Sequence, residues 1–285
     1  MKINQISPLD NKFTQIIGTI ALVPSTLYYI GELPAERRPA VAIVGTRRPT
    51  AYGREVTERL AGDLARRGVV IVSGMALGID AIAHRAALDA GGTTIAVQAN
   101  GLDRLTPTSN RQLGEDIVKS GGAIVSEYEP NEPPYAFRFL ERNRIVSALS
   151  DAILITEASS RSGTLNTARH ALEQGKEVFV VPGNITSPLS AGCNALLKQG
   201  ATPVTDANDI LHVIAPQLLK PQTQMVLADN PLQSSIIRLL SDGIRDGDEL
   251  HRLAEVSASE FGAELTMMEI NGQIRSLGAN QWTLR

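Results

Sequence analysis

Three polar loops that contain glycine interrupt the stretch between Val41 and Ile210, and each lies between an apolar run and a helix-like segment. Backbone amides at a helix N-terminus point outward and the helix dipole adds partial positive charge, so such loops favour phosphate or carboxylate. Three of them at one edge of a sheet predict a site for a ligand with several phosphates. The loops are Gly45-Thr46-Arg47-Arg48-Pro49, Ser73-Gly74-Met75-Ala76-Leu77-Gly78-Ile79-Asp80 and Ser162-Gly163-Thr164-Leu165-Asn166-Thr167-Ala168.

The segments around these loops predict an α/β fold. Short β-branched runs alternate with helix-like stretches, and glycines separate several of those helices from the next run. Because the runs are apolar throughout, we expect a Rossmann-like, mostly parallel sheet with helices on both faces. Ligands of such sheets bind beyond the carboxyl ends of the strands, where the three loops fall. The expected strands are Val41 to Val44, Val69 to Val72, Thr94 to Val97, Ala123 to Val125, Ala152 to Ile155 and Glu177 to Val181.

The size and composition of the chain are ordinary for a globular protein. Its 285 residues are 43% hydrophobic, which is enough for one large domain and a small one. No segment approaches the roughly 20 uninterrupted apolar residues of a membrane span, and Met1 to Asn11 lacks the form of a signal peptide. We therefore expect a cytoplasmic protein without membrane contact. The single cysteine, Cys193, excludes an intramolecular disulfide and a cysteine-based zinc cluster.

The net charge of −3 and the pI near 5.9 show that the chain as a whole is not a polycation. Nonspecific electrostatics would not bring it onto nucleic acid, so any anion site must be local. Arginines do cluster in two places, which a solvated charged face would explain equally well. The clusters are Arg37, Arg38, Arg47, Arg48 and Arg54 around the first loop, and Arg138, Arg142 and Arg144, which outnumber Glu141.

The three loops belong to a longer series of motifs. The series comprises Val41-Ala-Ile-Val-Gly-Thr-Arg47, Ser73-Gly-Met-Ala-Leu-Gly-Ile-Asp80 with Ala83-His84, Gly101-Leu102-Asp103-Arg104 with Pro107 and Asn110, Ser126-Glu127-Tyr128, Arg142-Asn-Arg-Ile-Val146, Ser162-Gly-Thr-Leu165 with Thr167-Ala168, Val181-Pro-Gly183, and Gly192-Cys-Asn194 before Gly200-Ala201. In order and spacing it resembles the DprA/Smf family of DNA-processing proteins. The resemblance covers roughly Leu27 to Arg285.

The resemblance implies a protein that binds single-stranded DNA without catalysis or a cofactor. It further implies protection of that strand and its handover to the RecA recombinase, during natural transformation or related recombination. A single pocket covers few nucleotides, so a longer grip would require a homodimer, which the resemblance also implies. The residues that the motifs assign to DNA or phosphate are Gly45, Thr46, Arg47, Arg48, Ser73, Gly74, Arg142, Asn143, Arg144, Ser162, Gly163 and Thr164.

Several of these assignments have structural alternatives. Ser73 and Gly74 are equally typical of a tight strand-to-helix turn. Ser162 or Thr164 could instead cap the following helix. Positions two apart on a helix diverge by about 200°, so we expect one of Arg142 and Arg144 to bind DNA while the other braces the fold. We expect Asp80 to be an acid in the first turn of a helix, and His84, four residues later, to pack against it as a structural partner.

The chain departs from the family pattern in two places. Leucine replaces the usual proline in Phe139-Leu140-Glu141-Arg142-Asn143-Arg144, and Glu141 lowers the local potential, so we expect weaker DNA affinity. The N-terminal segment departs from the pattern as well. Family members commonly carry a helical domain there, whereas we expect residues 1–36 to form only a short extension ahead of the sheet. Aromatic residues are only 4% of the chain, and Phe137 and Phe139 are the candidates for base stacking, although both could equally belong to the core.

The C-terminal part predicts a separate small domain. Residues 216–230 read as a linker after a main domain of residues 37–215, and residues 231–285 show a winged-helix pattern. Three glutamates and no lysine or arginine stand between Ser257 and Gln273, where a DNA-binding helix would need cations. We therefore expect this domain to contact protein or to pack. Its expected elements are Leu232 to Leu240, Gly247 to Val256, Ser259 to Ile270, Gln273 to Ser276 and Gln281 to Leu284.

Two other functions fit the loops less well. Phosphoribohydrolases of the lysine-decarboxylase-like group follow a Gly-Gly-x-Gly-Thr loop with a catalytic glutamate, but Ser162 to Ala168 has no such acid and Glu173 is too distant. A dinucleotide-binding protein would need Gly-x-Gly-x-x-Gly spacing, which Gly45 to Gly53 lacks. Nucleotide turnover would support the enzyme, and salt-sensitive oligonucleotide binding without turnover would support the DNA-binding protein.

Overall fold

The computed structural model describes residues 2–219, 230–278 and 280–284. The chain divides into two compact units, Met1–Leu219 and Lys220–Arg285. The predicted linker, residues 216–230, lies for the most part outside the described residues, and its first residues, Pro216–Leu218, form a short 3-10 helix. Within the described residues, no helix is both long enough and apolar enough to cross a membrane.

The first unit contains a nine-stranded sheet with the strand order β1-β2-β6-β5-β4-β3-β7-β8-β9. From β6 to β9 all neighbouring strands are parallel, whereas β1 and β2 pair in antiparallel fashion at one edge. The predicted parallel strands are confirmed, with ends that differ by one residue in places. The strands are β1 (Asn4–Ile6), β2 (Leu27–Gly31), β3 (Ala40–Val44), β4 (Val70–Ser73), β5 (Thr94–Val97), β6 (Ala123–Ser126), β7 (Ala152–Ile155), β8 (Glu177–Val180) and β9 (Thr202–Pro203).

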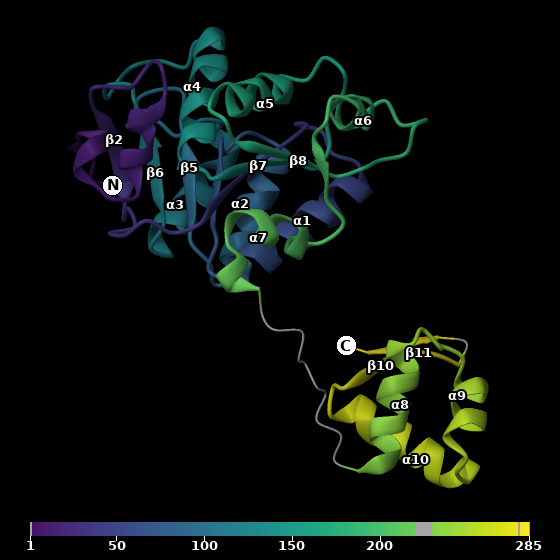
Figure 1. Cartoon of the computed structure of the whole chain (residues 1–285). Coiled ribbons are helices and arrows are strands. Elements are labelled where there is room, and N and C mark those ends of the chain that lie inside the picture. Colours follow the sequence, from purple (N-terminus) through teal and green to yellow (C-terminus); the bar gives the residue numbers. More distant parts are fainter. Residues whose placement is uncertain (1, 220–229, 279, 285) are drawn as a thin grey trace. The chain divides into compact units, whose positions relative to one another are not determined.

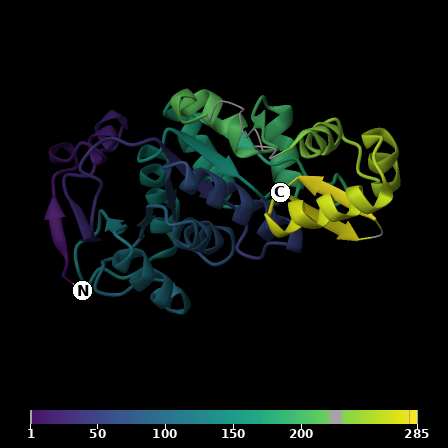
Figure 2. The same ribbon diagram turned by 90° about the horizontal axis from the view of Figure 1, so that it is seen from below.

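The prediction that residues 1–36 form an extension ahead of the sheet is wrong. β2 pairs along its length with β6, from Tyr28 opposite Ser126 to Gly31 opposite Ala123, and its Leu27 is fully buried. Figure 2 shows this N-terminal segment, in purple, at one edge of the first unit. A strand that pairs in antiparallel fashion needs no crossover helix, so a search for alternating strands and helices does not find β2.

Helices cover both faces of the sheet (Figure 1). One apolar core packs α4, α5 and α6 against one face of the sheet. On the opposite face, a second core packs α1, α2 and α7 against the strands, and a third core packs α3 against them. This two-sided burial is the reason why the strands are apolar throughout rather than alternating. The helices are α1 (Ala51–Arg66), α2 (Ile79–Asp89), α3 (Arg111–Lys119), α4 (Ala136–Ala148), α5 (Thr164–Glu173), α6 (Ala191–Lys198) and α7 (Ala207–Ile214).

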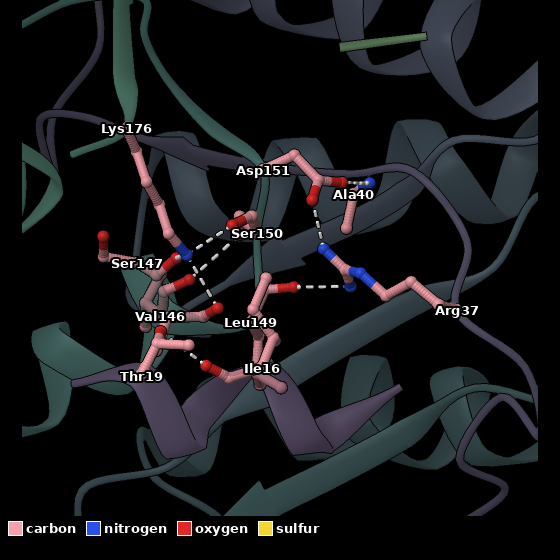
Figure 3. Close-up of polar contacts among 11 residues, drawn as sticks. Ile16, Thr19, Arg37, Ala40, Val146, Ser147, Leu149, Ser150, Asp151 and Lys176 are labelled. Carbon is pink, nitrogen blue, oxygen red and sulfur yellow. Dashed lines mark hydrogen bonds and ion pairs between the residues drawn. The ribbon is translucent and has the colours of Figure 1, made fainter. Parts of the chain in front are cut away.

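Helix α4 is fixed at its C-terminal end by cations that bind carbonyl oxygens (Figure 3). Lys176 Nζ donates to the carbonyls of Ser147 and Ala148, both at 2.7 Å. The orphan carbonyls of a helix end are thereby satisfied, and positive charge there complements the helix dipole. Arg37 binds Asp151, whose other carboxylate oxygen accepts from the Ala40 amide at 2.8 Å. Arg37 also donates to the Leu149 carbonyl at 3.3 Å, so the end of α4 is tied to the segment before β3 by Arg37 and to the residue before β8 by Lys176.

The second unit has the predicted winged-helix arrangement of three helices followed by a hairpin. They are α8 (Pro231–Ser241), α9 (Gly247–Ala254), α10 (Ala258–Ile270), β10 (Ile274–Gly278) and β11 (Gln281–Leu284). Side chains from all three helices form one apolar core, with Ile236, Leu250 and Met268 each fully buried. Asn230, Asp246 and Ser257 cap the three helix N-termini with their side chains. The predicted fold class is confirmed.

Candidate nucleic-acid interface

A cleft of about 310 Å³ opens beyond the carboxyl ends of β3, β4 and β7. All three predicted loops contribute to its wall, as expected at this edge of a parallel sheet. The start of α4 forms the remaining side. The residues that line the cleft are Val44, Gly45, Thr46, Arg47, Ala76, Asp80, Phe139, Leu140, Arg142, Asn143, Ser159, Ser162, Gly163, Thr164 and Thr167.

Most of the predicted site residues therefore lie together, but four do not line the cleft. Arg48 is exposed beside it, with its amide donating to the Thr46 hydroxyl at 3.3 Å. Ser73 and Gly74 lie beneath the cleft wall, and Arg144 points to another side of α4, where it binds Glu127. The lining residue Ser159 was not predicted, although its place just after β7 could have indicated it.

The first loop is held rigidly while its arginine stays free. The Thr46 amide donates to the Glu157 carbonyl at 2.8 Å, and the Thr46 carbonyl accepts from the Ile79 amide at 3.1 Å. A Cβ on Gly45 would lie 2.8 Å from the Glu157 carbonyl oxygen, so only glycine fits there. Arg47 is exposed, and its guanidinium has no carboxylate partner within the described part of the chain.

The polar groups of the second loop make hydrogen bonds within the protein. The Ser73 hydroxyl donates to the Ile43 carbonyl at 2.6 Å, and the Gly74 amide donates to Asp80 at 3.1 Å. A Cβ on Gly74 would lie 2.7 Å from an Arg142 nitrogen and 2.8 Å from an Asp80 oxygen. The predicted DNA contact by Ser73 and Gly74 is therefore not what this geometry supports. It favours the alternative of a tight, packed turn.

The third loop begins α5 with little side-chain capping. Gly163 is the residue before the first helical turn, and the Ser162 hydroxyl accepts from the Thr164 amide at 3.2 Å. The amides of Gly163 and Arg47 donate to no protein acceptor among the described residues. Both residues line the cleft. The wall of one cleft therefore contains two amides without a protein acceptor, a helix N-terminus and an unpaired guanidinium, which are the groups that an anion site uses.

Arg142 is buried beneath the cleft rather than free to bind a ligand. It is only 4% exposed and donates to the carbonyls of Gly74, at 2.8 Å, and Val97. Burial lowers the pKa of Arg142 to about 10 and raises the pKa of Asp80, and the opposite charge of each opposes the shift of the other. Arg142 thus braces the loops after β4 and β5.

Arg144 is braced as well, so both arginines of the motif have protein partners, although we expected one of them to bind DNA. Its two terminal nitrogens donate to both Glu127 oxygens, at 2.8 and 2.6 Å. The side chains of Arg142 and Arg144 do leave the helix about 200° apart, but each finds protein partners on its own side. Asn143, between them, lines the cleft together with the buried Arg142.

His84 is structural, but its partner is not Asp80 as the sequence predicts. Its Nδ1 lies 2.7 Å from the Thr94 hydroxyl, which itself donates to the Ile71 carbonyl at 2.7 Å. A hydroxyl has one proton, so His84 must donate from Nδ1, and its Nε2 is a buried acceptor without a partner in the described structure. Burial and Arg142 lower the pKa of His84 to about 3, so the ring is neutral.

The cleft wall also offers a ring. Two guanidiniums lie near the Phe139 ring, with 5.8 Å from the Arg47 Cζ and 5.9 Å from the Arg142 Cζ to the ring centroid. Leu140, which replaces the family's proline, lines the cleft beside it. Phe137 does not line the cleft and is 56% exposed. Among the described residues no group of three His, Cys, Asp or Glu side chains could hold a metal ion.

Comparisons with known proteins agree with this architecture. The family described as DNA recombination-mediator protein A matches residues 4–215, and the DprA winged helix domain matches residues 220–280. The chain belongs to the DprA/Smf family. This confirms the resemblance that the motifs indicate.

Two relatives show how far this family likeness extends. Protein Smf of Escherichia coli is 37% identical over 295 residues, which cover 99% of this chain and 78% of that protein. The DNA processing protein DprA of Streptococcus pneumoniae is 40% identical over 210 residues, which cover 74% of each chain. The likeness to Smf therefore includes both units.

Two solved DprA structures share the fold. DprA of Streptococcus pneumoniae superposes with a TM-score of 0.69 at 39% identity, covering 75% of each chain. DNA processing protein A of Helicobacter pylori superposes with a TM-score of 0.67 at 35% identity, covering 76% of this chain and 97% of that one. The Helicobacter structure concerns the single-stranded DNA binding mode of that protein.

Proposed function

We propose that this protein binds single-stranded DNA, with a backbone phosphate held in the cleft by Arg47 and by the free amides of Arg47 and Gly163. The observation that carries the proposal is that an unpaired, exposed guanidinium, the unused amides of Arg47 and Gly163, and the N-terminus of α5 all belong to the wall of one cleft. Charged donors to phosphate give strong hydrogen bonds, and the amides need no side-chain ordering to bind. The single-stranded DNA binding mode described for the Helicobacter pylori relative supports the same reading.

The cleft suits single-stranded DNA of any base sequence. Its donors face phosphate, and phosphate contacts position a strand but carry no base information. Phe139 offers a ring face on which an unpaired base could stack, which is tolerant of base identity. Thr46, Ser162, Thr164 and Asn143 supply further donors and acceptors at the wall. Arg48, exposed beside the cleft, adds to the positive potential that attracts the strand.

The bracing groups beneath the cleft set its shape. Arg142 ties the loops after β4 and β5 together, and Asp80 accepts from the Gly74 and Ala76 amides at 3.1 and 3.3 Å. Because Arg142 Nη1 and the Asp80 carboxylate already bind protein groups, we infer that they position the cleft wall rather than hold the strand. We propose that the Arg-Asn-Arg motif serves chiefly as such a brace, with the half-buried Asn143 at the cleft wall.

We further propose that the bound strand is protected and passed to the RecA recombinase, in the cytoplasm, during natural transformation or related recombination. One cleft covers few nucleotides, so a homodimer would join two clefts along one strand. Family membership supports this role. The test is RecA filament formation on single strands covered by a single-strand-binding protein, where this protein should shorten the lag. An unchanged lag, under conditions in which the protein binds the strand, would contradict the handover.

The winged-helix unit is proposed to contact protein rather than duplex DNA. Glu260 and Glu269 are exposed on α10, together with Met267 at 51% and Ile270 at 73% exposure. Glu264 instead packs internally, accepting from Asn230 at 3.1 Å. A helix face of apolar and acidic groups offers no grip on phosphates. Residues 220–285 produced alone should bind duplex DNA weakly, and tight binding with a steep salt dependence would contradict this assignment.

The structure offers nothing that favours the enzymatic alternative. Among the residues described at the cleft wall, Asp80 is the one carboxylate, and two backbone amides already occupy it. Helix α5 carries threonine and asparagine near the cleft where a phosphoribohydrolase needs a glutamate. We therefore propose binding without turnover.

The test is an anisotropy titration of a labelled single strand and its duplex at two salt concentrations, with nucleotide hydrolysis followed in parallel. We expect salt-dependent binding that prefers the single strand and no hydrolysis. Hydrolysis of a nucleotide, without binding of either DNA, would contradict the proposal and support the phosphoribohydrolase alternative.

A further inference from the structure

Four side chains at the start of α4 form a ladder of planar groups that the proposed function does not use. The Arg138 guanidinium lies between two rings, 4.3 Å from Tyr128 and 5.0 Å from Tyr135. The Tyr135 ring stacks on Phe137, with 5.8 Å between centroids and 7° between planes. The order of the ladder is therefore Tyr128, Arg138, Tyr135 and Phe137.

The inner part of this ladder is fixed by polar contacts. Arg138 binds the Glu132 carboxylate and donates to the Pro133 carbonyl at 3.1 Å, and its side chain is 13% exposed. The Tyr128 hydroxyl donates to Glu141 at 3.2 Å. Because the guanidinium is neutralised by a carboxylate and covered by two rings, it is not a site for phosphate. It holds the outer rings in place.

The outer part is bare. Tyr135 is 50% exposed and Phe137 is 56% exposed, although both are large and at least half apolar. Tyr135 covers one face of the Phe137 ring, and no ring or cation covers the other among the described residues. A rigid, exposed ring face at the end of a planar stack is the surface that a further planar group would extend.

The ladder and the cleft share the start of α4. Phe137 precedes the cleft-lining Phe139 by two residues, which is about 3 Å along the axis of α4. The same two residues turn by about 200°, so the ring of Phe137 leaves the helix on the side away from Phe139. A strand long enough to pass from the cleft around the start of α4 would meet the ladder on that side.

We propose that the outer face of Phe137 stacks a nucleobase several nucleotides along the strand from the phosphate held in the cleft. This rests on the proposed function, because the strand must be anchored at Arg47 for its continuation to reach Phe137. A flat base completes a stack of flat groups, whereas the neutralised Arg138 leaves no charge there for a phosphate. Every base has a ring face, so the platform extends the footprint without adding sequence preference.

The test compares wild type, Phe137→Ala and Phe137→Trp in binding oligo(dT) of about four and about sixteen nucleotides. Phe137→Ala should weaken binding of the longer strand by about five- to a hundredfold and leave its salt slope unchanged, since no charge is removed. The shorter strand should bind as before. Phe137→Trp should keep the affinity, and its added indole emission, measured against wild type with Trp282 alone, should be quenched on binding.

Leu172→Ala provides a matched control, because Leu172 is 60% exposed on α5 and lies outside the ladder. It should change neither affinity. Wild type that binds neither oligonucleotide would overturn both proposals together. Wild type that binds the longer strand as tightly as a folded Phe137→Ala would overturn the platform alone. An unchanged affinity with a shifted oligomeric state of Phe137→Ala would likewise overturn it and assign the rings to a protein contact.

Discussion

Replacing Arg142 by methionine removes a buried cation that joins three parts of the site. Arg142 is 4% exposed, donates to the Gly74 and Val97 carbonyls and faces the buried Asp80. Each hydrogen bond from a charged donor contributes about 1.5–3 kcal/mol, and removing one partner of a buried pair costs about 3–5 kcal/mol. These contributions overlap, so we expect the free energy of unfolding to fall by about 3–5 kcal/mol.

The measurement is urea unfolding followed by circular dichroism, with Arg144→Met as the matched control on the same helix. Arg144 and Glu127 side chains are 15% and 14% exposed, so water can reach the glutamate that is left behind. We expect this control to lose about 1–3 kcal/mol. A folded Arg142→Met whose unfolding free energy lies within about 1 kcal/mol of wild type would refute the reasoning.

The pH dependence gives a second readout of the same variant. Without Arg142, the pKa of the buried Asp80 rises further, because the charge that opposed the effect of burial is gone. A carboxyl with a raised folded-state pKa contributes stability below its unfolded value, about 3.9, and loses it as pH rises through the folded value. The gap between wild type and Arg142→Met should therefore narrow as the pH is lowered toward about 4.

Two further predictions concern single residues of the same region. The pKa of His84 is about 3 in the folded state, below its ordinary value, because the buried ring resists protonation. The free energy of unfolding is therefore at its full value at neutral pH and falls as the pH drops from about 6.5 toward 3, where the unfolded chain binds a proton at His84 and the folded chain does not. Urea unfolding of wild type should lose about 1.4 kcal/mol more per pH unit than His84→Gln across that window, and equal slopes would contradict the assignment. Gly163→Ala should melt within a few degrees of wild type, because its Cβ meets only the Leu140 side chain, at 4.0 Å. Its methyl lies at the cleft and should weaken single-strand binding in anisotropy, whereas undiminished binding would place the phosphate elsewhere.

The sequence predicts the parallel sheet well because two-sided burial leaves a direct mark on it. Strands such as Val70–Ser73 and Ala152–Ile155 are buried at every position, which produces largely apolar runs without alternation. β2 leaves a weaker mark, since only Leu27 and Ile30 of its five residues are buried and no crossover helix follows it. The position of the three loops follows from topology alone, so it could be predicted as well.

The division of labour within the site could not be predicted, because it depends on partners distant in sequence. Arg142 and Arg144 look alike in the motif, yet their partners, the Val97 carbonyl and Glu127, come from other segments. Ser73 becomes structural only because the Ile43 carbonyl lies within 2.6 Å. The ladder ending at Phe137 could not be predicted for the same reason, because Tyr128 comes from the segment before α4.

The most direct test of the central claim is the salt dependence of single-strand binding by Arg47→Ala, with Arg111→Ala as the control. Arg111 is 76% exposed on α3, pairs with Glu115 and lies outside the cleft. Arg47→Ala should weaken binding to all sequences alike and lower the slope of log affinity against log salt by about 0.7–1, whereas Arg111→Ala should not. A folded Arg47→Ala that binds as tightly as wild type, with the same slope, would contradict the account.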